Sequence, residues 1–329
     1  YVGAVRLTME DGSCGWGQMS TYCADITSTI FHRQVAPHVL GKEFDDFTDM
    51  GRLILEREHK FPGSYVLRAL AGLDTALWDW LGRKRELPVT SLIGGSPGLV
   101  PVYASSMKRD ISPHDEAKRF IRLRDDSGFK AFKFRVGAEC GRGHDEWEGR
   151  TEKIIVEVPN ALGSQIIKMV DANSCYSADK AIQIGNMMID NGISHFEEPC
   201  PYWLPDETKK VTEALSLDVT GGEQDCDMRI WKDLIDRKVV DIVQPDIMYM
   251  GGLTRALEVA NFANAANITC TPHAANLSLV TVCTMHFINA IENGGKFLEY
   301  SIEGEDYYPW QKGLFLGDPF RVNEGNLKI

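Results

Sequence analysis

The hydrophobic and polar positions divide the chain into two parts with different patterns. Residues 2–9 and 14–18 alternate loosely on either side of a polar turn, which predicts a β-hairpin. Three helical patterns follow, and the strongest covers residues 64–83, where apolar side chains recur at helical spacing. A glycine pair at 94–95 then interrupts the pattern. We therefore expect residues 1–95 to form a small α+β domain.

From residue 100 onward, short apolar runs alternate with helical patterns. Alternating strands and helices predict a parallel sheet with right-handed crossovers. Eight such units over about 200 residues match a (β/α)8 barrel whose last unit is modified. We therefore predict an α/β fold, a modified (β/α)8 TIM barrel with an N-terminal α+β capping domain. The predicted strands are residues 100–105, 131–136, 166–171, 193–197, 218–223, 240–246, 268–272 and 296–300.

The ends of the chain complete the predicted domain organisation. The barrel covers residues 96–300 and is the catalytic part, because chemistry in this architecture collects at the C-terminal ends of the strands. Residues 301–329 contain several aromatic side chains and turns, and we expect them to pack back on the capping domain. The chain opens at Tyr1 inside a strand-like run, so we expect native N-terminal residues to precede it.

Composition narrows the class of protein. The 47 acidic and 35 basic residues give a formal charge of −12 without basic runs, so nucleic acid is not an expected partner. The eight cysteines show no C-x-x-C pair, which favours a reducing cytoplasm over disulfide bonds. No apolar run approaches the length of a membrane span, and no signal peptide is visible. We expect a cytoplasmic protein that binds a small molecule and has no membrane partner.

Three carboxylates close successive predicted strands at equal spacing. Asp171, Glu197 and Glu223 lie 26 residues apart, one β/α repeat each. An acid near a strand end is, taken singly, more often a helix N-cap than a metal ligand. Three acids at repeat spacing instead supply the oxygen ligands that Mg²⁺ prefers, with positions left for water or substrate. The sequence therefore predicts a magnesium site at this end of the barrel.

Alternation within a strand predicts which side chains face the barrel interior. Phe132 and Phe134 share one face and belong outside against the helices, so Lys133 and Arg135 point inward. Two interior cations need a counter-charge, because burying them unpaired costs free energy. The same alternation, with Phe196 outside, turns Glu197 inward and leaves Glu198 outside the interior set.

Polar groups also end the later strands. Asp246 closes one strand, His273 follows the next after 27 residues, and Glu299 follows 26 residues later. His273 alone is explained equally well as a helix cap or a loop contact. Its pairing with an acid at the neighbouring strand end favours catalysis, because a carboxylate orients an imidazole and raises its basicity. Tyr22 follows the predicted hairpin, and we expect it to reach the substrate from the capping domain.

The ordered set of motifs resembles the enolase superfamily and, within it, the mandelate racemase-like subgroup. The resemblance covers essentially the whole chain. Besides the three acids, the motifs are Leu-Asp-Thr-Ala-Leu-Trp-Asp at 73–79, Gly-Gly at 94–95, Lys-x-Arg at 133–135, Gln-Pro-Asp at 244–246, Gly-Gly-Leu-Thr at 251–254 and His273.

The resemblance implies a specific chemistry. Mg²⁺ bound by Asp171, Glu197 and Glu223 would hold a substrate carboxylate while a base removes the α-proton, and the cation would stabilise the enediolate. His273, oriented by Asp246, would be an acid–base group. The resemblance also implies a homo-oligomer, and it places a loop that closes over the substrate before Tyr1.

Two further positions are carried over by the same resemblance. Glu299 would hydrogen-bond the substrate carboxylate from the side opposite the metal. Asn173 would lie near the metal and the substrate.

Arg135 departs from the racemase pattern. Two-base members of the subgroup have a second lysine there, whereas arginine stays protonated and is a poor general base. The leading hypothesis is therefore a lyase, a sugar acid dehydratase that eliminates water from an acid sugar or related hydroxy acid to give a 2-keto acid. Lys133 and Arg135 would bind the carboxylate, and the division of acid and base roles between this pair and His273 stays open.

Two alternatives to the dehydratase remain. One is an isomerase acting on a carboxylate, either a racemase or epimerase or a lactonizing cycloisomerase. The other is a catalytically silent barrel that serves as a metal-binding or assembly protein.

Overall fold

The N-terminal domain combines a hairpin with a set of helices. The computed structural model describes residues 2–44, 46–311 and 313–329. Strands β1 (Ala4–Thr8) and β2 (Cys14–Gln18) pair antiparallel, as the alternation predicted. The helical elements are α1 (Ala24–Ile30), the π-helical segment η1 (Phe31–Val35), α2 (Ala36–Val39), α3 (Phe47–Arg57), α4 (Ser64–Arg85) and α5 (Val89–Leu92).

Helix α4 is the centre of this domain because the hairpin packs directly on it. Its apolar side chains Leu70 and Leu73 are buried, as the helical periodicity predicted. A Cβ atom on Gly17 of β2 would lie 2.1 Å from the carbonyl oxygen of Gly72 in α4. Only glycine allows the two backbones to approach this closely.

The second domain is a curled sheet of parallel strands. Its order is β10 (Leu298–Ser301), β3 (Leu99–Ser105), β4 (Ala131–Arg135), β5 (Ile167–Asp171), β6 (His195–Glu197), β7 (Asp218–Gly221), β8 (Ile242–Val243) and β9 (Thr269–Cys270). Cys270 of β9 forms a parallel bridge with Gly294, just before β10, which joins the two ends of this order. The predicted modified (β/α)8 barrel with an N-terminal capping domain is confirmed.

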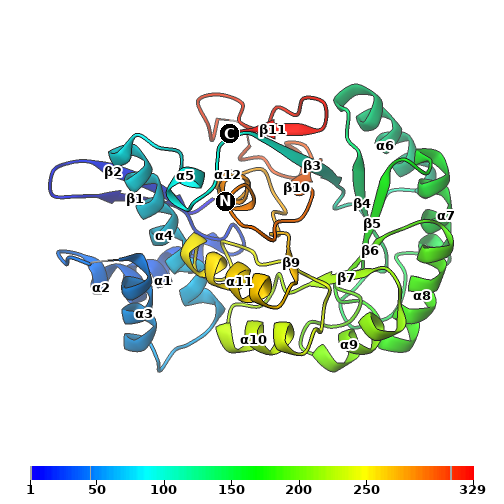
Figure 1. Ribbon diagram of the computed structural model, residues 1–329, viewed down its shortest axis with the longest axis horizontal. Coiled ribbons are helices and arrows are strands. Elements are labelled where there is room, and N and C mark those ends of the chain that lie inside the picture. Colours follow the sequence, from blue (N-terminus) through cyan, green and yellow to red (C-terminus); the bar gives the residue numbers. More distant parts are fainter. Residues whose placement is uncertain (1, 45, 312) are drawn as a thin grey trace.

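Helices cover the outer face of the barrel (Figure 1). Phe132 and Phe134 of β4 are fully buried beneath them, and the ring centroids of Phe120 and Phe132 lie 4.8 Å apart. This packing places the alternate side chains of β4 inside. The helices are α6 (Pro113–Ser127), α7 (Arg150–Leu162), α8 (Ala178–Asp190), α9 (Pro205–Ala214), α10 (Met228–Asp236), α11 (Leu253–Ala265) and α12 (Leu279–Ile288).

The segment after β10 hydrogen-bonds to the barrel, and its expected packing on the capping domain stays a prediction. Strand β11 (Asn326–Lys328) pairs antiparallel with β3. The Tyr308 hydroxyl donates to the carbonyl of Ala275, and Glu303 pairs with Arg119 of α6 at 3.1 Å. Edge pairing with β3 fixes this segment through its backbone, which side-chain composition does not reveal. Within the described residues, no helix is long and apolar enough to span a membrane.

The two domains are joined by a buried carboxylate on α4. Asp74 accepts hydrogen bonds from the hydroxyl of Thr254 at 2.5 Å and from its backbone N–H at 3.2 Å, and so caps α11 of the barrel from the other domain. A Cβ atom on Gly252, whose φ is +106°, would lie 2.3 Å from the Asp74 carboxylate. Burial raises the pKa of Asp74 to about 6, although the Thr254 bonds oppose this. The contact therefore depends on close backbone approach as well as on hydrogen bonding.

We predict that Asp74→Ala lowers the free energy of unfolding by about 2 kcal/mol, because the start of α11 loses its cap and the two partly buried donors of Thr254 lose their acceptor. Urea denaturation measures the change. Arg85→Ala, at an exposed position of the same helix, is the control and should stay within about 0.5 kcal/mol of the unaltered protein. Equal stability of the two variants would contradict the prediction.

Candidate active site

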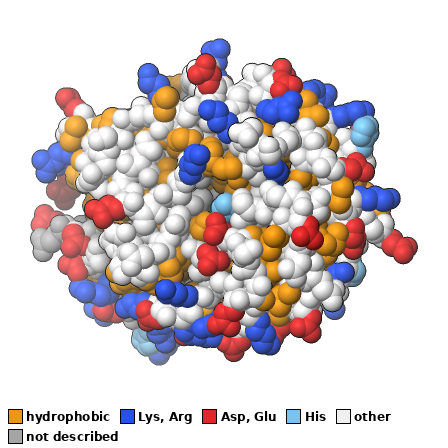
Figure 2. Space-filling model, turned by 45° about the vertical axis from the view of Figure 1, so that its right-hand side comes forward, with side chains coloured by type: hydrophobic (Ala, Val, Ile, Leu, Met, Phe, Trp, Pro, Cys, Tyr) orange, Lys and Arg blue, Asp and Glu red, His pale blue; other side chains and the backbone are white. Residues whose placement is uncertain are grey.

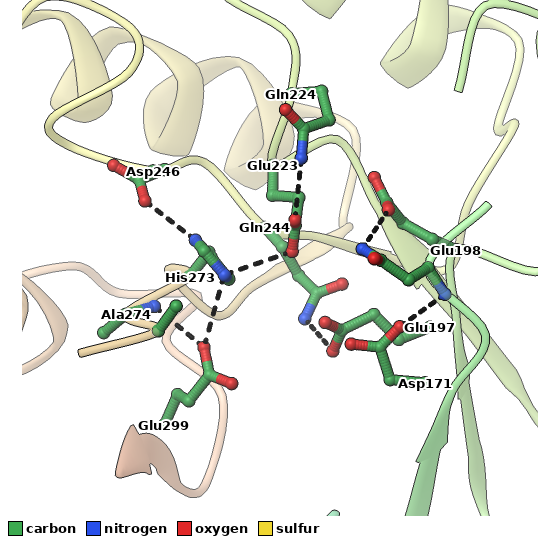
Figure 3. Close-up of polar contacts among 12 residues, drawn as sticks. Asp171, Glu197, Glu198, Glu223, Gln224, Gln244, Asp246, His273, Ala274 and Glu299 are labelled. Carbon is green, nitrogen blue, oxygen red and sulfur yellow. Dashed lines mark hydrogen bonds and ion pairs between the residues drawn. The ribbon is translucent and has the colours of Figure 1, made fainter. Parts of the chain in front are cut away.

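The candidate residues gather at the C-terminal ends of the barrel strands. Parallel register sets Arg135 beside Asp171 and Asp171 beside Glu197, on β4, β5 and β6. Asp246 and His273 form an isolated parallel bridge after β8 and β9. Figure 3 shows the side chains of Asp171, Glu197, Glu223, Asp246, His273 and Glu299 converging. All of the following are buried: Lys133, Arg135, Asp171, Glu197, Glu223, Asp246, His273 and Glu299.

Lys133 is at the centre of the ion pairs. Its Nζ lies 2.7 and 2.8 Å from the two carboxylate oxygens of Glu197 and 2.8 Å from Oε1 of Glu299. Arg135 pairs with Asp171. The pairs supply the counter-charge that the two interior cations require. Burial opposes the charged form of Lys133, but Glu197 and Glu299 raise its pKa well above the usual value.

His273 is held by a fixed carboxylate. Asp246 accepts from Nδ1 of His273 at 2.7 Å, while the other Asp246 oxygen accepts the backbone N–H groups of Met248 and Tyr249 at 2.7 and 3.0 Å. These bonds fix the ring and turn Nε2 toward Glu223, at 3.2 Å. Burial lowers the pKa of His273, but the surrounding acids, led by Glu223, outweigh it and raise the pKa to about 10.

Acids outnumber cations in this cluster. Six buried carboxylates, with Glu198 included, face two permanent cations and one histidine. Burial raises the pKa of Glu197 to about 8, because Lys133 offsets only part of the cost and Asp171 adds like charge. Burial also raises the pKa of Glu223, against the pull of His273. The site therefore has room for additional positive charge.

Glu198 is a further buried acid beside this cluster. Alternation left it outside the interior set, and its side chain accepts from the Asn173 amide at 3.4 Å and the Ser174 hydroxyl at 3.3 Å. Strand β6 ends at Glu197, and Glu198 has a φ of +40°. Burial alone does not distinguish the interior from the outer face, because the helices also bury outward side chains of the strands.

The predicted metal ligands reach one rim, but each faces a cation of the chain. Within residues 2–44, 46–311 and 313–329, no group of three or more His, Cys, Asp or Glu side chains is arranged to hold a metal ion. Asp171 faces Arg135, Glu197 faces Lys133, and Glu223 faces His273. The donor chemistry nevertheless fits Mg²⁺, because it consists of clustered carboxylate oxygens with uncompensated negative charge.

Two of the predicted substrate-binding residues lie beside this cluster, and the role of Tyr22 stays a prediction. Glu299 accepts from the Ser105 hydroxyl and from the backbone N–H of Ala274, both at 2.8 Å. The backbone N–H of Asn173 donates to Asp171 at 2.7 Å. The Tyr22 side chain is 67% exposed, and the hydrogen bond described for this residue joins its backbone N–H to Ser20.

Gln244 is a site residue that was not predicted. Its Nε2 donates to Glu197 at 2.7 Å, and its Oε1 is buried without a hydrogen-bond partner in the described chain. It lies two residues before Asp246 and therefore shares its strand face, which was the available signal. Gln244 and Glu197 also line a cavity of about 290 Å³ together with Tyr103 and His195 of the barrel interior.

Comparison with known families matches both parts of the chain. Residues 1–94 match the N-terminal domain of mandelate racemase / muconate lactonizing enzyme. Residues 115–329 match the enolase C-terminal domain-like family. Together these matches cover most of the chain.

Two curated relatives carry out different reactions. Arabinonate dehydratase from Saccharolobus solfataricus is 27% identical over 88% of this chain and 77% of its own length. D-galactarolactone cycloisomerase from Agrobacterium fabrum is 30% identical over 87% of this chain and 74% of its own length. Both names refer to small sugar-derived substrates.

Solved structures share the complete fold. A protein from Roseobacter denitrificans, provisionally named a racemase, is 57% identical with a TM-score of 0.98, covering 100% of this chain and 90% of its own. A mandelate racemase/muconate lactonizing protein from Paracoccus denitrificans, solved with magnesium, is 28% identical with a TM-score of 0.91, covering 99% and 87%.

We predict that Lys133→Met lowers the free energy of unfolding by about 3–5 kcal/mol in EDTA, because Glu197 and Glu299 lose their buried partner. Urea denaturation followed by circular dichroism measures the loss. Lys296→Met, which changes an exposed barrel lysine lying over the Phe297 ring, is the matched control. A loss no larger than that of the control would show that the buried pairs do not stabilise the fold.

Proposed function

The chain belongs to the mandelate racemase / muconate lactonizing enzyme family of the enolase superfamily, and we propose that it removes the α-proton of a carboxylate substrate with Mg²⁺ bound by Asp171, Glu197 and Glu223. We propose further that the reaction is β-elimination of water from an acid sugar or related hydroxy acid, giving a 2-keto acid. The observation that carries the proposal is the His273–Asp246 pair, whose other ring nitrogen faces Glu223 of the acid cluster.

The three carboxylates are the proposed ligands because they supply oxygen donors from neighbouring strands. When bound, the ion supplies positive charge beside the substrate carboxylate, where negative charge accumulates as the α-proton leaves. Lys133 and Arg135 lie beside the same acids and are placed to bind that carboxylate as well. Gln244 orients Glu197 through its amide.

His273 is the proposed group for the proton transfers. The acids around His273, led by Glu223, favour its charged form, so a cation that occupied Glu223 would favour the neutral ring. The neutral ring takes the α-proton at Nε2, while Asp246 holds Nδ1–H and stabilises the imidazolium. The imidazolium then donates the same proton to the departing β-hydroxyl. One C–H and one C–O bond break, a C=C bond forms, and water leaves; the resulting enol becomes the 2-keto acid. One residue thus serves both halves of an elimination.

Arg135 favours elimination over two-base isomerisation. Burial opposes its charged form, but Asp171 and Glu197 hold the pKa of the guanidinium above its already high value. A residue that stays protonated cannot take a proton from the opposite face of the substrate. The relative named as a dehydratase agrees with this choice.

Isomerisation remains the second candidate because of the position of Lys133. Glu299 lies between two acid–base groups: one oxygen is 2.8 Å from Lys133 Nζ and the other is 3.9 Å from His273 Nε2. A racemase, epimerase or cycloisomerase requires acid–base groups on two sides of the substrate, and Lys133 and His273 lie on two sides of Glu299. Relatives named as a cycloisomerase and a racemase support this alternative.

We also propose a cytoplasmic homo-oligomer that binds a small carboxylate rather than nucleic acid. The cysteines of the described chain are free thiols. Acidic and basic side chains are interspersed on the face shown in Figure 2, without a continuous basic patch.

We predict that MgCl₂ added after EDTA treatment stabilises the protein by about 2.7 kcal/mol at 100 times the dissociation constant. Glu223→Gln should abolish most of this stabilisation because it removes a charged ligand. Asp218→Asn is the control, because Asp218 is an exposed acid at the opposite end of β7. Thermal unfolding at increasing MgCl₂ checks the prediction, and equal stabilisation of all three proteins would contradict it.

We predict that incubation with acid sugars and Mg²⁺ in D₂O yields a 2-keto acid with loss of water. His273→Asn should lower the rate about 10²–10⁴-fold, because general acid–base catalysis contributes this much. His195→Asn, which changes a histidine of the barrel interior, is the control.

Proton NMR and keto-acid detection distinguish the candidates. Inversion, cyclisation or deuterium exchange without loss of water would replace the dehydratase with an isomerase. No exchange with any carboxylate of a broad library would favour a catalytically silent barrel.

A further inference from the structure

Arg109 lies in the loop between β3 and α6, at the same rim as the proposed site. Its Nε donates to the carbonyl of Gly137 at 3.2 Å, two residues beyond Arg135. The fully buried Arg150 donates to the carbonyls of Lys108 at 3.4 Å and Arg135 at 2.9 Å. These bonds tie the loop to the end of β4, and the Arg109 guanidinium lies within electrostatic range of Arg135 and Asp171.

Arg109 differs from the other cations of this rim in having no acidic partner. Lys133 and Arg135 both pair with carboxylates. Among the residues that the structure describes, no Asp or Glu oxygen lies within 4.0 Å of the Arg109 guanidinium. Burial lowers the pKa of Arg109, and the like charge of Arg135 lowers it further. A guanidinium in these surroundings gains from pairing with an anion.

The unused donors of Arg109 fit a carboxylate. Only Nε has a hydrogen bond with the described chain, so both Nη groups are available. The Arg109 residue is only partly buried, which leaves its Nη groups accessible to a bound molecule. Two parallel N–H groups are the donor set of a bidentate carboxylate contact.

We infer that Arg109 binds a second carboxylate of the substrate, so that the site takes dicarboxylic acid sugars in preference to monocarboxylic ones. This inference rests on the proposed function, in which Lys133, Arg135 and the metal site hold the first carboxylate. A substrate with two negative charges approaches a rim that contains six buried acids, and Arg109 supplies the positive charge that its distal end needs.

The test uses two unreactive probes with MgCl₂ present. Adipate has two carboxylates on a six-carbon chain, and adipamate replaces one of them with a neutral amide of the same shape. Isothermal titration calorimetry should show that the unaltered protein binds adipate about tenfold or more tightly than adipamate, since a hydrogen bond to a charged group contributes about this much. Arg109→Gln should remove that preference, and Arg109→Lys should retain part of it.

Arg142→Gln is the matched control, because Arg142 is an exposed cation on the neighbouring loop after β4. It should retain the full preference for adipate. No preference in the unaltered protein, including no binding of either probe, overturns the inference. Equal weakening of both probes by Arg109→Gln also overturns it, because Arg109 would then act on the first carboxylate or on the fold. These outcomes are independent of proton exchange in D₂O, which tests the proposed function by itself.

Discussion

The buried excess of negative charge at one end of the barrel constrains everything around it. Six carboxylates withdrawn from water are tolerated only because backbone N–H groups, hydroxyls and a few cations surround them. Lys133 contacts two of these acids directly and lies 3.7 Å from a third, Asp171. The close pairs leave the cluster under-compensated: burial raises the pKa of Glu197, Lys133 offsets only part of this effect, and Asp171 adds to it. A divalent cation is the natural complement of such a cluster, so the stability of the rim and its chemistry have the same physical origin.

The barrel converts even spacing in the sequence into proximity in space. One β/α repeat carries the chain from the end of one strand to the end of the next, and parallel register then sets Asp171 directly beside Glu197. Backbone contacts hold the loops that follow: Arg150 fixes the loop after β3 to the end of β4, and Asp246 is fixed by the N–H groups of its own turn. The capping domain is joined to this framework by Asp74.

Most of the fold was predictable because the spacing of apolar residues along the chain indicates which side chains are buried. The hairpin, the long helix of the first domain and the strands of the barrel were found from apolar spacing, and the positions of the rim residues followed from strand ends. Three features lay outside this signal. Glu198 lies just past the end of β6, Arg109 lies in a loop, and β11 joins β3 by backbone pairing. A side-chain period does not govern these positions, so their geometry had to come from the structure.

The choice between elimination and isomerisation depends on which groups can exchange a proton on each side of the substrate. Arg135 is a permanent cation paired with Asp171 and cannot accept the substrate proton. Lys133 is therefore the alternative to His273 as the acid–base residue. Lys133 is held by two carboxylates that favour its charged form, so releasing a proton requires those pairs to weaken. His273 carries a single fixed hydrogen bond to Asp246 and presents its other nitrogen to the site. Because a cation bound by Glu197 and Glu223 would compete with Lys133 and His273 for the same oxygens, it would release both groups for chemistry. His273 is the better prepared of the two, since its orienting partner, Asp246, is not a proposed ligand. This asymmetry is the physical reason to expect one acid–base residue rather than two.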